Sequence, residues 1–189
     1  MRIHLAACAF AALAAPAAAQ DHSGHEMGSD TNSMAMDHAH HAALTRALAM
    51  ENRAEDRARD QYRHPFETLD FFEVKPGMTV VDYMPASGWY TRVLVPYLGA
   101  QGRYVGLTPD PAAADGERFA NYFAKLPGDF ETARGGWNLS GAPISVYASQ
   151  DLPEEIKGQV DRVLVFREMH NLLRSGVLYT ELMRMRGLL

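Results

Sequence analysis

Polar side chains stand at four places in the sequence where a short apolar run ends. In chain order they are Asp82 with the turn Pro85, Ala86, Ser87 and Gly88, then Asp110, then Gln150 and Asp151, and finally Arg167, Glu168, His170 and Asn171. Carboxylates accept hydrogen bonds, a turn before a helix presents backbone N–H groups to a ligand, and imidazole titrates near neutral pH. These residue types predict a site that binds a polar small molecule and moves a proton.

The segments around these residues alternate between strand-like and helix-like patterns. The strand-like runs are residues 78–81, 102–107, 143–147 and 161–166, and the helix-like ones are 44–62, 66–72, 89–98, 111–125 and 176–186, with a loop over 128–141. Alternation at this spacing predicts βαβ units in a mainly parallel sheet. Ligands of such sheets bind beyond the carboxyl ends of the strands, where the strand order reverses, so the four polar groups are expected to meet there.

Each polar group also has a plain structural explanation. Asp110 lies 22 residues after Gly88, about the spacing at which a dinucleotide-binding fold places a carboxylate on a ribose hydroxyl. A lone Asp after a strand is also a common turn or cap residue. His170 and Asn171 could likewise cap the last helix. Four polar groups at four successive strand ends favour a ligand site over four independent caps.

Five stretches of the sequence together resemble a family of class I methyltransferases, many of them exported, that use S-adenosylmethionine. They are residues 59–65 (RDQYRHP), 66–72 (FETLDFF), 74–82 (VKPGMTVVD), 88–91 (GWYT) and 161–171 (DRVLVFREMHN). The resemblance extends from about Ala54 to the end of the chain. It implies an α/β fold with a Rossmann-like, doubly wound, mainly parallel sheet, incomplete at about four of seven strands and preceded by N-terminal helices.

The resemblance also assigns a cofactor role to the first three polar groups. Asp82 and the turn 85–88 would hold the methionine end of S-adenosylmethionine. Asp110 would contact its ribose, and Gln150 with Asp151 would lie by the adenine.

The fourth polar group falls on the side where the family transfers the methyl group. Residues 167–171 would line that side, with Arg167 and Glu168 as further cofactor-binding residues. His170 would be the base, and Asn171 would orient a small-molecule acceptor. Three further side chains could close over the cofactor or serve only in packing: Arg63, His64 and Tyr90.

The sequence departs from the family pattern at three points. Met84 and Ala86 stand where the family has glycines, which permit a positive φ and close backbone approach. The second strand ends in Thr108 and Pro109 rather than in an acidic residue. The family continues through a Lys-Pro-Gly-Gly turn into strands five to seven, so the resemblance implies a chain cut short by a truncated gene model or a frameshift. A non-catalytic methyltransferase-like remnant is therefore an alternative.

The N-terminus resembles a leader for export. Residues 1–19 combine Arg2, a short apolar run and small residues before an expected cleavage after Ala19. The run is too short to span a bilayer, which takes about 20 residues, although it could also be the buried first helix of a domain. Cleavage would remove Cys8, the only cysteine, and release a periplasmic or secreted protein without a stable membrane anchor.

Residues 20–43 are polar, lack a hydrophobic period and are predicted to be disordered, so the folded domain is expected at 44–189. Imidazole and thioether groups are suitable ligands for copper. A copper-binding tail is therefore an alternative function, and the simpler interpretation is a linker that binds metal ions only weakly. The groups concerned are His22, His25, Met27, Met34, Met36, His38, His40 and His41.

The charge of the chain excludes one class of partner. The 189 residues carry a net charge of −5 and contain no Lys/Arg cluster. Nucleic-acid binding depends on such clusters to neutralise phosphates, so the sequence predicts a small-molecule substrate and no nucleic acid. It does not predict an oligomeric state.

Overall fold

The computed structural model describes residues 27–189, with side chains from residue 35 onward, and its centre is a parallel sheet. The strands are β1 (Thr79–Tyr83), β2 (Arg103–Thr108), β3 (Ile144–Ala148) and β4 (Arg162–Val165). They lie in the order β3-β2-β1-β4, and every neighbouring pair is parallel. The predicted strands are confirmed, with boundaries shifted by one or two residues.

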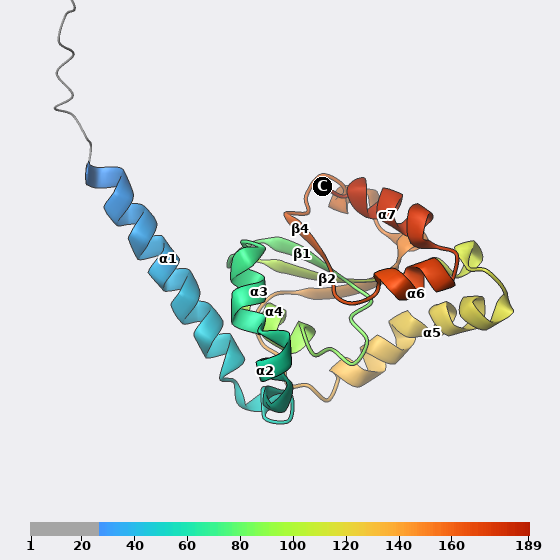
Figure 1. Cartoon of the computed structure of the whole chain (residues 1–189), viewed down its shortest axis with the longest axis horizontal. Helices are drawn as coiled ribbons and strands as arrows, with labels where there is room; N and C mark the ends of the chain where they lie inside the picture. The colour runs from blue at the N-terminus through green and yellow to red at the C-terminus, as the bar shows by residue number, and fades with distance from the viewer. Residues whose placement is uncertain (1–26) are drawn as a thin grey trace, which may run out of the picture.

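Helices cover both faces of this sheet (Figure 1). They are α1 (Met27–Leu48), α2 (Asp60–Arg63), α3 (Pro65–Phe71), α4 (Thr91–Leu98), α5 (Glu117–Arg134), α6 (Met169–Arg174) and α7 (Leu178–Arg186). α1, α3 and α4 pack on one face, and α6 and α7 on the other. Phe130 and Phe123 of α5 contribute to the two cores respectively. The chain therefore has the α/β, Rossmann-like architecture predicted from its sequence.

Strand β1 is buried on both faces because its side chains alternate between the two cores. Val80 belongs to the core under α4, whereas Val81 and Tyr83 belong to the core under α6 and α7. A strand buried on both sides reads as an apolar run without alternation. This leaves Asp82 as a carboxyl group inside the fold, next to the carboxyl end of the strand.

The single helix predicted over residues 44–62 is wrong, because α1 ends at Leu48 and short 3₁₀ turns follow at Glu51–Arg53 and Arg57–Arg59. Arg53 is the reason. Its fully buried guanidinium donates to the carbonyl oxygen of Leu48 at 2.8 Å and to Asp60 at 2.8 Å. These bonds fold the chain back on itself, which a continuous helix would not allow.

The loop predicted over residues 128–141 begins too early, because α5 continues through Pro127 and Gly128 to Arg134. Both residues disfavour helix. Phe130 lies in this extension, is buried, and stacks on Tyr104 with ring centroids 6.3 Å apart. Burial of one aromatic side chain stabilises by about 1.5–3 kcal/mol, enough to offset the unfavourable local sequence.

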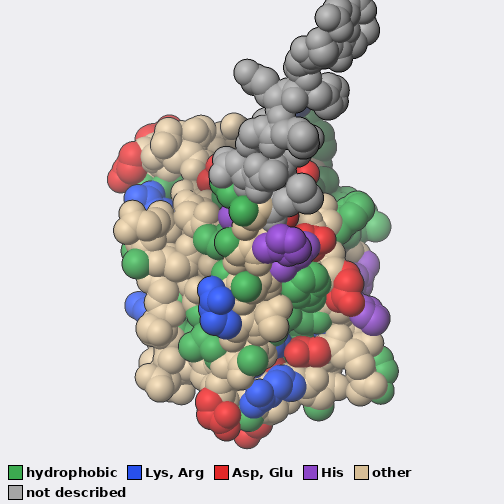
Figure 2. Space-filling view, turned by 90° about the vertical axis from the view of Figure 1, so that its left-hand side faces the viewer, with side chains coloured by type: hydrophobic (Ala, Val, Ile, Leu, Met, Phe, Trp, Pro, Cys, Tyr) green, Lys and Arg blue, Asp and Glu red, His purple; other side chains and the backbone are tan. Residues whose placement is uncertain are grey.

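α1 begins inside the segment 20–43, which the sequence predicts to be disordered, and continues beyond it into the domain predicted from residue 44, where it packs on its neighbours. Leu44 and Ala47 are buried against α3 and α4, and His41 places Nε2 2.9 Å from Asp70 Oδ1. Figure 2 shows histidine and acidic side chains next to one another on the face that includes α1. Residues 1–26, with the predicted leader, lie outside the described part. Within that part, no helix is both long and apolar enough to cross a membrane.

Candidate functional site

A cavity of about 640 Å³ opens at the carboxyl ends of β1 and β4. The chain runs outward from β1 through β2 to β3 and then returns to the other side of β1 as β4. The strand order reverses between β1 and β4, which is where open parallel sheets bind ligands. Sixteen residues line the cavity: Arg59, Tyr62, Arg63, Thr68, Asp82, Met84, Pro85, Ala86, Ser87, Trp89, Tyr90, Phe166, Arg167, Glu168, His170 and Asn171.

The turn after β1 forms one wall and holds non-glycine residues in the left-handed region. Met84 has φ 58° and Ala86 has φ 49°, at the two positions where the family resemblance implies glycine. Gly88 follows with φ 73°, and a Cβ there would lie 2.1 Å from the Trp137 ring. The turn therefore has the left-handed backbone conformation that glycine favours, although Met84 and Ala86 are not glycines. Strained backbone of this kind concentrates at ligand sites.

Arg92 holds this turn in place through hydrogen bonds. Its Nη1 donates to the carbonyl oxygen of Ser87 at 2.9 Å, and its Nη2 donates to Asp56 at 2.7 Å. Arg92 and Asp56 are both largely buried. One guanidinium therefore links the turn to the N-terminal segment that forms the opposite wall.

Replacing Ala86 by Gly is expected to raise the free energy of unfolding by about 0.5–1 kcal/mol. A left-handed φ costs an L-residue about 1–2 kcal/mol, and the greater freedom of glycine in the unfolded chain offsets part of the gain. The measurement is urea-induced unfolding. The matched control is Ala124→Gly in the exposed middle of α5, which should lose about 1 kcal/mol. A comparable loss for Ala86→Gly would show that the turn is not strained.

Asp82 is a buried carboxyl group at the floor of the cavity. Only 2% of its surface is exposed, and Oδ2 accepts a 2.8 Å hydrogen bond from the hydroxyl of Tyr104. Among the described residues, Oδ1 has no hydrogen-bond partner. Burial raises the pKa of Asp82 to about 7, and the Tyr104 hydrogen bond opposes the rise. The carboxyl is thus placed to receive a cationic or hydrogen-bond-donating ligand group.

Aromatic rings and guanidinium groups form the wall opposite His170. Tyr90 stacks on Phe166 with centroids 3.7 Å apart, and Arg63 lies 4.4 Å from the Trp89 ring centroid. Burial lowers the pKa of Arg63, and the nearby positive charges of Arg59 and Arg167 lower it further. This end of the cavity is therefore electropositive and aromatic.

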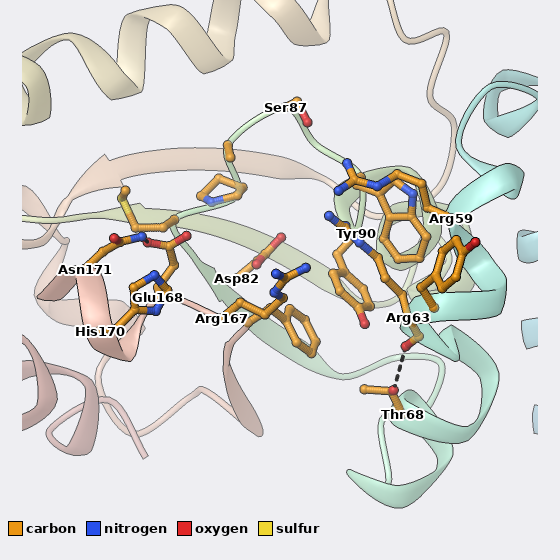
Figure 3. A pocket seen from close by; sticks show the side chains of 16 residues that line it. Arg59, Arg63, Thr68, Asp82, Ser87, Tyr90, Arg167, Glu168, His170 and Asn171 are labelled. Carbon is orange, nitrogen blue, oxygen red and sulfur yellow. Dashed lines mark hydrogen bonds between the residues drawn. The ribbon is translucent and has the colours of Figure 1, made fainter.

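The residues after β4 form the other end, so the structure brings the fourth predicted group into the cavity. Asn171 Nδ2 donates to Glu168 Oε2 at 2.9 Å, and the exposed ring of His170 lies beside them. Figure 3 shows these three side chains at one end and Arg59 and Arg63 at the other. His170 and Asn171 lie in the short helix α6 and do not cap α7, which begins after Val177.

Asp110 does not line this cavity. Its Oδ2 accepts from Arg184 Nη2 at 2.8 Å, and its Oδ1 caps the following turn through Ala112 N–H at 2.8 Å. Its own N–H donates to the fully buried Glu181 of α7. The residue serves as a cap, which was the plainer explanation of its position, and α7 covers it.

Gln150 and Asp151 also lie away from the cavity. Both are exposed, and they hydrogen-bond to each other at 3.0 Å.

A smaller cavity of about 230 Å³ adjoins the main cavity. It shares Met84, Ala86, Glu168 and Asn171 with the first cavity, and α5 adds Phe119, Tyr122 and Phe123.

Six residues of the main cavity were not predicted as site residues, namely Arg59, Tyr62, Thr68, Met84, Trp89 and Phe166. Of the three side chains expected to close over a cofactor, Arg63 and Tyr90 line it and His64 does not. The one signal available was the spacing of Arg59, Tyr62 and Arg63, three and four residues apart on one helical face. Nothing local indicated that this face would oppose β1.

The described part of the chain contains no group of three or more His, Cys, Asp or Glu side chains that could bind a metal. His22 and His25 lie outside the described residues, and so do the side chains of Met27 and Met34. Met36 and His38 are exposed on α1, and His40 is half buried there. His41 is paired with Asp70. No observation on these residues favours copper binding.

No protein-family model and no curated protein sequence matches the chain. Solved structures with similar folds include a SAM dependent methyltransferase from Aquifex aeolicus, at 22% identity and a TM-score of 0.38. They also include a cyclopropane-fatty-acyl-phospholipid synthase-like protein from Lactobacillus casei ATCC 334, at 20% identity and a TM-score of 0.37. The matches cover 64% and 65% of this chain and 56% and 45% of those structures, so the chain spans about half their length. Likeness this low adds nothing to the assignment of a function.

Proposed function

We propose that the chain is an S-adenosylmethionine-dependent methyltransferase acting on a small molecule. The observation that carries the proposal is the buried Asp82, which presents an oxygen without a hydrogen-bond partner among the described residues at the switch point of the sheet. A cavity of about 640 Å³ stands above it, within the range of about 300–1,000 Å³ for small-molecule sites. The leader-like residues 1–19 extend the proposal to an enzyme that works outside the cytoplasm.

The residues present fit the methionine end of S-adenosylmethionine. Asp82 Oδ1 would accept a hydrogen bond from the ammonium group of the cofactor. The turn 84–88 would lie close to the amino and carboxyl groups of its methionine moiety. The nucleoside end does not fit the residues first predicted for it, because Asp110 is held by Arg184 and covered by α7. The adjoining apolar cavity, with Phe119 and Tyr122, is the place that suits a purine.

The chain's own residues would orient the acceptor and take its proton. Bound S-adenosylmethionine supplies an electrophilic methyl group, whose transfer needs mainly alignment with a nucleophile. A ring nitrogen of His170 would accept the proton of a protic acceptor. Asn171, held by Glu168, would orient that acceptor, and the Tyr90–Phe166 stack would exclude water.

Calorimetric titration of S-adenosylmethionine into the full chain tests the proposal. Saturable binding is expected, with an affinity that rises about eightfold between pH 6 and pH 7.5, because a cation binds the ionised form of a carboxyl whose pKa is about 7. Asp82→Asn should weaken binding by about ten- to a hundredfold at pH 7.5 and abolish the pH dependence.

The matched control is Asp129→Asn on the exposed side of α5, which should bind like the unchanged chain. Absence of binding by a folded chain would overturn the proposal. Equal loss in both variants would remove Asp82 from the site.

A further inference from the structure

Three arginine side chains from different parts of the chain line the main cavity. Arg59 and Arg63 come from the turn and short helix before α3, and Arg167 follows β4 with a left-handed φ of 61°. Burial lowers the pKa of Arg63, and the positive charges of Arg59 and Arg167 lower it further, whereas Tyr90 and Asp56 act in the opposite direction. The fold therefore holds like charges together, which costs free energy in the absence of a ligand.

Arg63 is partly buried and Arg59 and Arg167 are exposed, and all three differ from the paired arginines elsewhere in the domain. Arg53 is paired with Asp60, Arg92 with Asp56, and Arg184 with Asp110 and Glu181. Within residues 35–189, by contrast, the guanidinium groups of Arg59, Arg63 and Arg167 make no ion pair and no hydrogen bond.

The buried part of the Arg63 side chain also lacks a hydrogen-bond partner among the described residues. Its Nε atom is buried and has no hydrogen-bond partner among the described residues, while its guanidinium carbon lies over Trp89. Buried polar groups of proteins are nearly always hydrogen-bonded. Planar guanidinium groups match carboxylates and phosphates with two parallel hydrogen bonds. An anionic oxygen group beside these three arginines would neutralise the cluster and supply the missing acceptors.

We propose that Arg59, Arg63 and Arg167 bind a carboxylate or phosphate group, and that this group belongs to the methyl acceptor. The second part rests on the proposed function. S-adenosylmethionine carries a sulfonium and an ammonium against one carboxylate, so three guanidinium groups repel it as a whole. Arg59 and Arg63 lie at the end of the cavity opposite His170, and Arg167 lies between them and His170 (Figure 3). The acceptor is thus a small anion whose reacting end faces His170 and whose charged end lies on the arginines.

Titration of inorganic phosphate into the full chain, followed by tryptophan fluorescence, tests the site without any cofactor. Trp89 lies against Arg63, so binding should change its emission. Arg63→Gln and Arg167→Gln should each weaken binding by about ten- to a hundredfold. Arg167 is exposed, so its variant is expected to fold even if loss of the Arg63–Trp89 contact unfolds the other.

Arg103→Gln is the matched control, because Arg103 is exposed at the opposite end of β2, and it should bind phosphate unchanged. No phosphate binding by the unchanged chain, or equal binding by Arg167→Gln, would overturn the anion site. So would a loss in Arg103→Gln as large as that in Arg167→Gln.

A second titration assigns the source of the anion. S-adenosylhomocysteine carries the carboxylate of the cofactor, and methylthioadenosine lacks it. If the arginines serve the acceptor, Arg167→Gln binds both nucleosides like the unchanged chain. Weaker binding of S-adenosylhomocysteine alone would overturn the assignment to the acceptor. Phosphate binding that depends on the arginines in a chain that binds neither nucleoside would refute the proposed function and leave the anion site standing.

Discussion

Replacing Asp82 by Asn is expected to raise the free energy of unfolding by about 4 kcal/mol at pH 8 and by less than about 1 kcal/mol at pH 4. The folded-state pKa of about 7 lies above the unfolded value of about 3.9. Between these values the folded protein binds more protons than the unfolded chain, so its stability falls as the pH rises through this window. Asparagine removes the buried charge and can still accept the hydrogen bond from Tyr104.

Chemical unfolding of both proteins at several pH values measures this difference. The exposed Asp129→Asn variant is the control, and its stability should follow that of the unchanged chain at each pH. A difference for Asp82→Asn that does not grow between pH 4 and pH 8 would mean that Asp82 is not kept neutral by burial. Together with the expected loss of cofactor binding, a gain in stability would identify a residue kept for function at a cost in stability.

Replacing Glu181 by Ala is expected to lower the free energy of unfolding by about 3–5 kcal/mol, because removal of one partner of a buried ionic network leaves the others without compensation. Glu181 is fully buried, and its Oε1 accepts hydrogen bonds from Ser149, the Asp110 N–H and Arg184. These contacts fasten α7 to the ends of β2 and β3.

Thermal and urea-induced unfolding measure the loss, and Glu155→Ala provides a matched control on an exposed glutamate. Glu155→Ala should change stability by less than about 0.5 kcal/mol. Glu181→Gln keeps an acceptor oxygen and should lose less than Glu181→Ala. Equal effects of Glu181→Ala and Glu155→Ala would show that the network does not hold α7 in place.

The sequence predicted the parallel sheet because strands buried on both faces need consecutive apolar, branched residues. Val80 and Val81 of β1 illustrate this, and so do the apolar residues of β4. It predicted much less about the segment before α3. Arg53 reads as an ordinary surface residue of a helix, and the sequence leaves Arg63 open between cofactor contact and packing, because their contacts with Asp60 and Trp89 depend on how the chain folds back.

The residues of the candidate site also fall into two groups, those that the sequence predicted and those that only the structure brought together. The sequence by itself determined that Asp82, the turn 85–88 and residues 167–171 would meet, because parallel strands bring their carboxyl ends to one end of a sheet. Only the tertiary structure decided that the Asp110 carboxylate would pair with Arg184 and its N–H would donate to Glu181, which are 74 and 71 residues away along the chain. It also decided that Arg59 and Arg63 would line the same cavity as Arg167 and lie near enough to it for their charges to interact. The physical reason is that strand ends are placed by local periodicity, whereas a charge takes whichever partners the packed chain brings within hydrogen-bond distance.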